Sequence, residues 1–235
     1  MQCNSPCNGA IFFKPLTMRN FFRHNSLSIV FLSLFIIALA LQAFTGLKQY
    51  NSEVKEKGGK QVSLGQYLSS GHFVEATFEN WESEFLQMAL FVTLTRFLYQ
   101  KGSSESKDPD KEKEEVDREP SLKRKDAPWA VKKGGVILSL YNYSLSYSLF
   151  LLFFLCFGAH WYGSMMEYNH EQILRGLPTE SALAYLGNSR LWFESFENWQ
   201  SEFLSVFALA ILSIYLRQKG SPQSKPVDAP HYQTG

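Results

Sequence analysis

The sequence predicts an all-α, polytopic membrane protein with four transmembrane helices, built from two tandem parallel helix–loop–helix repeats. Two observations predict this fold. The first is a set of four apolar runs separated by polar segments, and the second is a repeat at a constant offset of 118 residues. A bilayer core is about 30 Å thick, so a helix of about 20 mostly apolar residues crosses it. Among 235 residues there are 20 Phe, and the charged residues cluster between the apolar runs.

The predicted spans cover residues about 27–46, 81–99, 143–162 and 199–216. The first and third are strongly apolar. The second and fourth are weaker, because each carries a Glu one turn after its start. They begin with Trp81 and Trp199, and aromatic residues are typical of membrane interfaces. This pairing favours spans over amphipathic helices of a soluble core.

The repeat is densest where Phe78-Glu-Asn-Trp-Glu-Ser-Glu-Phe-Leu returns as Phe196-Glu-Asn-Trp-Gln-Ser-Glu-Phe-Leu. Between 26–110 and 144–228, 29 of 85 positions match without a gap. Chance gives about one match in 17, so the chain is a duplication. Each copy has an even number of spans, and the copies therefore share one orientation, unlike inverted transporter repeats. A pseudo-twofold axis along the membrane normal is expected.

Five segments follow from this pattern. Residues 104–131 are rich in Lys, Glu, Asp, Ser and Pro, and a segment of this composition is expected to be disordered. The residues before Met18 lack the pattern of a signal peptide. We predict a disordered N-terminal extension (1–17), repeat 1 (18–103), a disordered charged cytoplasmic linker (104–131), repeat 2 (132–220) and a disordered C-terminal tail (221–235).

The distribution of Lys and Arg predicts the orientation. Ten of these residues lie between the second and third spans, and others precede the first span and follow the fourth. The positive-inside rule then places both termini and the linker in the cytoplasm. A formal net charge of +1 argues against a nucleic-acid partner. The lipid bilayer is the expected partner, and a second copy of the chain or another protein is a further candidate.

The two outward loops carry helix-start signals. Ser63 and Ser181 are predicted N-caps of short helices, and Gly71 is a predicted stop for the first of them. Thr77 and Ser195 are then candidates for the start of the second and fourth spans.

The main candidate site is a polar cluster of Asn80, Glu84, Asn198 and Glu202. In each copy the Asn and Glu are four residues apart, which places them on one helix face. An ionisable group inside an apolar run is costly unless it faces protein or water. The cluster could bind a cation or relay a proton near the pseudo-twofold axis. The structural alternative stays open, because acidic residues also stabilise helix N-termini.

Weaker candidates are polar residues near the same ends of the helices. His72 aligns with Arg190, which indicates a basic residue at the membrane interface. His160, which aligns with Gln42, is expected to form a hydrogen bond inside the bundle. The Glu-x-x-His spacing that ends at His170 is typical of di-metal bundles, but it is not duplicated, so neither a metal nor a cofactor is predicted. The secondary site candidates are Glu79, Glu197, His72 and His170.

The motifs quoted above, together with the repeated Gln-Lys-Gly-Ser and the Asp-Ala-Pro-Trp that begins at Asp126, resemble a bacterial four-span membrane-protein family of unknown function. The resemblance covers nearly the whole chain from Met18. It implies a bacterial inner-membrane location and the four-span layout, and it implies no activity.

Three function classes remain open from the sequence. A non-enzymatic membrane interaction module is favoured, since no catalytic motif is present. The alternative is a conduit for a proton, cation or small solute that uses the duplicated Asn–Glu pair. The third class is a membrane-embedded enzyme with an outward site that combines Glu75, Glu79, His72 or His170.

Overall fold

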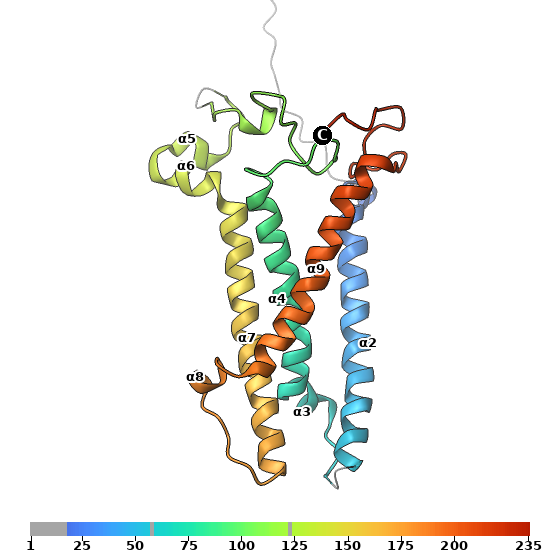
Figure 1. Cartoon of the computed structure of the whole chain (residues 1–235), viewed down its shortest axis with the longest axis vertical. Coiled ribbons are helices and arrows are strands. Elements are labelled where there is room, and N and C mark those ends of the chain that lie inside the picture. Colours follow the sequence, from blue (N-terminus) through green and yellow to red (C-terminus); the bar gives the residue numbers. More distant parts are fainter. Residues whose placement is uncertain (1–17, 57–58, 122–123) are drawn as a thin grey trace, which may run out of the picture. The chain divides into compact units, whose positions relative to one another are not determined.

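The structure, a computed structural model, describes residues 18–56, 59–121 and 124–235. The predicted extension, 1–17, lies outside the described residues. The described residues form helices joined by turns and contain no strand, so the all-α prediction is confirmed (Figure 1). The helices are α1 (Met18–His24), α2 (Ser26–Glu56), α3 (Leu64–Leu68), α4 (Gly71–Leu94), α5 (Trp129–Lys133), α6 (Gly135–Asn142), α7 (Ser144–Leu174), α8 (Ala182–Tyr185) and α9 (Ser189–Tyr215), with one 3-10 turn at Glu115–Asp117.

The chain divides into two compact units after Leu64. The first unit contains α1 and α2. The helix α2 is continuous over 31 residues, and the predicted span 27–46 lies inside it. Its last turns are polar, and Asn51 closes the segment that follows. The Asn51 side chain donates to the Val62 carbonyl at 3.0 Å and accepts from the Val62 N–H at 2.7 Å.

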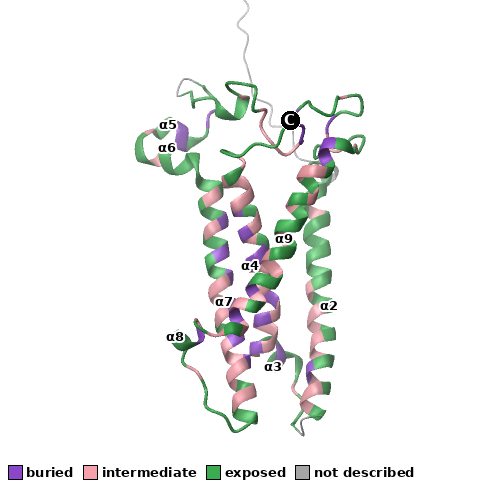
Figure 2. Cartoon of the chain, viewed as in Figure 1, coloured by how far each residue is buried: buried purple, intermediate pink, exposed green. Residues whose placement is uncertain are grey.

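The second unit is built on α4, which packs along α7 and is also contacted by α9. Figure 2 shows buried residues along α4 and α7, while much of α9 is exposed. The apolar core includes Leu86 and Ala89 of α4, Leu149 and Phe153 of α7, and Leu191 of α9. These helices hold the polar residues described below.

The crossing of α4 and α7 depends on two glycines. A Cβ atom added at Gly71 would lie 2.5 Å from the Glu167 nitrogen and 2.7 Å from the Gly163 oxygen. A Cβ added at Gly163 would lie 2.6 Å from the Glu75 nitrogen. The two backbones therefore touch without an intervening side chain. Such close packing is possible only for glycine, which lacks a Cβ atom.

The long helices begin earlier than the sequence predicts. The N-cap of α4 is Ser70, whose hydroxyl accepts from the Phe73 N–H at 3.3 Å, and Gly71 is the first helical residue. The N-cap of α9 is Asn188, whose side chain accepts from the Arg190 N–H at 2.9 Å. The predicted starts at Thr77 and Ser195 are therefore wrong, because capping residues about two turns upstream satisfy the first N–H groups.

The duplication is visible in local geometry. In repeat 2, Asn169 donates to the Glu180 carbonyl at 2.9 Å and accepts from the Glu180 N–H at 2.8 Å. Asn51 and Val62 occupy the corresponding positions in repeat 1 and make the same pair of bonds. Tyr67 and Tyr185, also equivalent, are 1% and 0% exposed.

The linker and the tail consist mainly of turns, with one 3-10 turn in the linker. The Gly102 N–H donates to the Thr234 hydroxyl at 2.9 Å. The Lys225 ammonium donates to the carbonyls of Gly102, His231 and Gln233. These contacts join the end of repeat 1, next to the linker, to the tail, and the disorder of the linker and the tail stays a prediction.

Two helices, α2 and α7, are long and apolar enough to cross a membrane, as judged by length and composition over the described residues. The helices α4 and α9 are not among them. Part of the reason is their polar first turns, which include Glu75, Glu79 and Glu82 in α4.

The glycine crossing gives a first prediction. Replacing Gly163 by Ala should lower the free energy of unfolding by about 1–3 kcal/mol, because the new methyl group forces α4 and α7 apart. Thermal unfolding of the purified protein in detergent measures this change. The control is Gly158→Ala on the same helix, where an added Cβ meets nothing within 4 Å. We expect that control to be neutral or stabilising, since Ala favours helices. Equal effects at both positions would contradict the packing argument.

Candidate functional site

A cluster of charged side chains lies between α4, α7 and α9. Each helix contributes residues three or four positions apart, a spacing that places them on one face. We call this cluster the polar centre. It consists of Glu75, Glu79 and Glu82 of α4, His160 and Ser164 of α7, and Arg190 and Glu194 of α9.

His160 is the buried middle of the polar centre. Its side chain is 0% exposed. The Nδ1 atom lies 2.7 Å from Oε2 of Glu82, and the Nε2 atom lies 3.2 Å from Oε2 of Glu194. Glu82 is also 0% exposed, and its Oε1 atom accepts from the Trp199 indole N–H at 2.9 Å. The prediction that His160 forms a hydrogen bond inside the bundle is confirmed.

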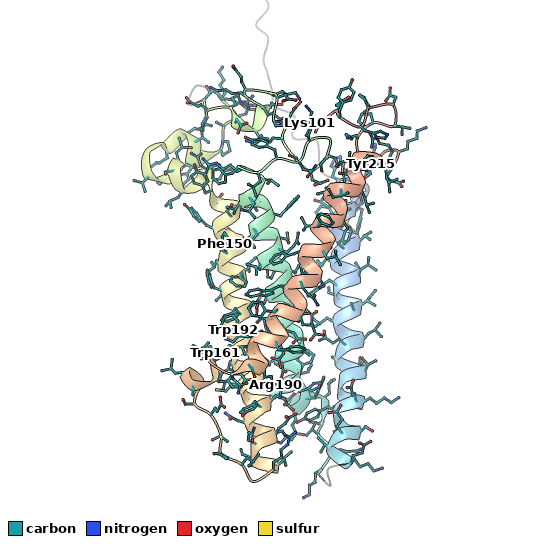
Figure 3. The ribbon with its side chains drawn as sticks, viewed as in Figure 1. Lys101, Phe150, Trp161, Arg190, Trp192 and Tyr215 are labelled. Atoms are coloured by element: carbon teal, nitrogen blue, oxygen red, sulfur yellow. The ribbon has the colours of Figure 1, made fainter. Side chains whose placement is uncertain are left out.

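Arg190 links the carboxylates at the more exposed end of the polar centre. Its guanidinium donates to Glu194 at 2.7 Å, to Glu75 at 2.9 Å and to Glu171 at 3.3 Å. The Arg190 side chain is 30% exposed, so this end is reachable by solvent. Figure 3 shows Arg190 in the first turns of α9. One cation thus joins residues of all three helices.

Glu194 accepts from several donors. Besides the Arg190 guanidinium, the Ser164 hydroxyl donates to it at 2.7 Å. Ser164 is also 2.8 Å from the hydroxyl of Tyr185, which lies at the end of α8. This chain of hydroxyls fixes the Glu194 carboxylate against α7.

Two carboxylates in the polar centre, Glu75 and Glu79, lack hydrogen-bond donors among the described residues for at least one oxygen. The Oε2 atom of Glu75 is buried and has no hydrogen-bond donor within the described chain. It faces the carboxyl group of Glu194. Glu79 makes no hydrogen bond or ion pair with any described residue, yet it lies near His160 and Glu194. Glu79, His160 and Glu194 each offer one ligand atom, and these atoms lie within 4.8 Å of one another.

The ionised polar centre carries excess negative charge. Its four carboxylates face two cationic groups, Arg190 and, at most, a protonated His160. Burying an uncompensated charge is costly, so the balance must come from bound protons or a bound cation. The arrangement can therefore take up positive charge.

The environment of the polar centre shifts the pKa values of two carboxyl groups, Glu75 and Glu194. Burial, together with the neighbouring Glu194, raises the pKa of Glu75 to about 8. Burial opposes ionisation of Glu194 as well, but hydrogen bonds from His160, Ser164 and Arg190 lower its pKa to about 2. The two adjacent carboxyls thus divide the roles of proton holder and anion.

The four residues of the predicted polar cluster lie outside the polar centre. The side chains of Asn80 and Asn198 donate to carbonyls one turn earlier on their own helices, at 2.9 and 3.0 Å. The carboxyl groups of Glu84 and Glu202 are neighbours. Glu84 is exposed, and Glu202 is partly exposed. Whether this pair has a function stays a prediction.

The secondary candidates divide between the polar centre and the surface. Glu79 belongs to the polar centre, whereas Glu197 and His170 are exposed. The His72 backbone N–H donates to Glu167 at 3.0 Å, and its ring lies 3.2 Å from the Tyr67 hydroxyl.

Sequence reasoning missed Glu82, Glu194 and the central role of His160. The sequence motif draws attention to residues retained in both copies, whereas the polar centre is asymmetric. Glu82 aligns with Gln200, Glu194 with Ala76 and His160 with Gln42. The available signal was a His within an apolar run, which marks a candidate functional site in a membrane helix.

The family model described as Domain of unknown function (DUF6766) matches residues 18–235. The chain belongs to this family. The match covers both copies of the duplication and every residue of the polar centre. No curated protein and no solved structure matches the chain. Membership in the DUF6766 family confirms that the chain belongs to a family of unknown function; the bacterial origin and the four-span layout of that family stay predictions.

Arg190 gives a second prediction. Replacing Arg190 by Gln should lower the free energy of unfolding by about 2–4 kcal/mol, since it leaves Glu75 and Glu194 without their shared cation. Chemical unfolding in detergent measures the loss. The matched control is Arg175→Gln, because Arg175 is 64% exposed and lies 3.8 Å from Glu171. Exposed pairs contribute about 0–1 kcal/mol. A similar loss in both variants would show that the polar centre does not depend on Arg190.

Proposed function

We propose that this chain is a multi-pass protein of the bacterial inner membrane that takes up protons or cations at the polar centre. The observation that carries the proposal is the excess of buried and half-buried carboxylates over cationic groups around His160. Ionisable residues within membrane helices are costly and are found where ions or protons bind or pass. This is the conduit class of function, and it now uses a different set of residues from the duplicated Asn–Glu pair.

The membrane setting is supported by apolar side chains that point away from the protein. The apolar window of α2 has no buried residue inside its unit, and only a third of the window of α7 is buried. On α9, several large apolar side chains are 43–68% exposed. Water would disfavour such surfaces, whereas lipid chains accommodate them. These residues of α9 are Phe193, Phe196, Phe203, Leu204 and Phe207.

The four-span topology gives a third prediction. Alkaline phosphatase fused after Lys60 or Pro178 should be active, since both loops are predicted to face outward. Green fluorescent protein fused after Asp110 or Gly235 should be fluorescent, because the linker and the C-terminus are predicted to be cytoplasmic. The two reporters control for each other at every position. Phosphatase activity after Asp110 would mean that α4 does not cross the membrane.

The exposed end of the polar centre lies next to the loop predicted to face outward. Arg190 and Glu171 keep 30% and 28% of their side chains exposed. Further inside, Glu194 is 13% exposed and His160 and Glu82 are 0% exposed. A proton or cation would therefore enter beside Arg190 and reach His160 through Glu194.

Flux measurements give a fourth prediction. The purified chain in liposomes should conduct protons or cations when a potassium diffusion potential is applied, with pH-sensitive and metal-sensitive dyes as readouts. His160→Gln should lose most of this flux, because the buried base between Glu82 and Glu194 is removed. His170→Gln is the matched control, since His170 is exposed on the same helix.

The flux proposal fails if the wild type conducts no more than protein-free liposomes, or if both His variants conduct like the wild type. A non-conducting chain that forms a defined oligomer by light scattering would favour the interaction module. The exposed apolar face of α9 supports that second candidate, since such a face can pack against another membrane helix.

A further inference from the structure

The side chains of Glu79, His160 and Glu194 form a three-ligand arrangement. One atom from each side chain lies within 4.8 Å of the other two. A tetrahedral divalent metal with ligand bonds of about 2.0–2.2 Å holds its ligand atoms about 3.3–3.6 Å apart. Because the three atoms lie within 4.8 Å of one another, binding requires any two of them to approach by at most about 1.5 Å, which side-chain rotation allows. The ligands come from α4, α7 and α9, so a bound ion would join all three helices.

Glu82 prepares His160 for metal binding. An ionised Glu82 carboxylate can only accept, so the proton of the 2.7 Å contact belongs to Nδ1 of His160. The Nε2 atom then faces Glu194, 3.2 Å away, and becomes a metal ligand when it releases its proton. Metal-binding His residues commonly donate their other ring N–H to a carboxylate, which fixes the tautomer. Trp199 holds Glu82 in turn by an indole hydrogen bond of 2.9 Å.

The ligands can exchange a proton for a metal ion. The 3.2 Å contact between Nε2 of His160 and Glu194 requires a proton on Nε2, and a bound metal ion would displace that proton. Glu79 has no hydrogen bond or ion pair to any described residue. Beside Glu194, Glu75 is 9% exposed, and its Oε2 atom has no donor in the described part of the chain. This buried oxygen faces the ligand Glu194, so the pair of carboxyl groups needs a shared proton or a nearby cation.

The residue types of the three ligands, one imidazole and two carboxylates, favour one class of metal ion. Imidazole suits Zn²⁺, Fe²⁺ and similar first-row ions, while two carboxylate oxygens also suit Mn²⁺. Mg²⁺ and Ca²⁺ prefer oxygen ligands alone. We propose that Glu79, His160 and Glu194 bind one divalent first-row transition-metal ion, with Glu82 as the residue that orients His160. This inference rests on the proposed uptake of cations, and it names the cation.

The experiment is a metal titration of the full chain, purified in detergent, freed of its affinity tag and stripped with a chelator. Co²⁺ binding is followed by its visible absorption, Zn²⁺ binding by calorimetry, and the stoichiometry by elemental analysis. The expected result is one ion per chain. Glu79→Gln should weaken binding by at least about tenfold while keeping the unfolding temperature of the metal-free protein, because Glu79 makes no hydrogen bond within the described residues.

The matched control is Glu197→Gln. Glu197 is the equivalent of Glu79 in the other repeat, within the same Phe-Glu-Asn-Trp motif, and it is exposed. It should bind metal like the wild type. The inference is overturned if the wild type binds no stoichiometric Co²⁺ or Zn²⁺, or if Glu79→Gln binds as tightly as Glu197→Gln. A chain that binds no metal but conducts protons through His160 would disprove the metal site and leave the proposed function standing.

Discussion

Where α4 crosses α7, the two backbones touch, and the rest of the second unit follows from that contact. Gly71 and Gly163 allow it, since a Cβ atom at either position would lie less than 3 Å from backbone atoms of the other helix. The short distance places the carboxylates that follow Gly71 on α4 beside His160, which precedes Gly163 on α7. A wider crossing would leave Glu82 and His160 too far apart to hydrogen-bond, and one buried polar atom of each would lose its partner.

The polar centre shows how a duplicated chain can build an asymmetric site. Both copies keep the motif Phe-Glu-Asn-Trp-x-Ser-Glu-Phe-Leu. Its Asn residues bond to carbonyls one turn earlier, and Ser83 and Ser201 bond to the carbonyls of these Asn residues. The motif therefore maintains the same helix geometry in each copy. Apart from Glu79, the charged residues of the polar centre occupy positions where the copies differ, so one buried centre forms from parts of both repeats.

Buried charge and exposed apolar surface occur together in this protein. The charged residues face one another between α4, α7 and α9, and the outer side of α9 carries exposed Phe and Leu. This is the reverse of the arrangement in water-soluble bundles, where charged faces are outside. It accords with a lipid environment, in which polar groups must find their partners inside the protein. Because of these charges, α4 is not among the described helices that are long and apolar enough to cross a membrane.

The sequence by itself determined the helical class, the duplication and the approximate positions of the long helices, because hydrophobic periodicity and the repeated motif are local properties. It also placed His160 inside the bundle, since an isolated His in an apolar run needs a partner. The starts of α4 and α9 were missed because Ser70 and Asn188 cap them upstream of the more obvious Thr77 and Ser195. Only the tertiary structure decided the partners of His160. The contacts to Glu82 and Glu194 span 78 and 34 residues, and they depend on a helix crossing that two glycines permit.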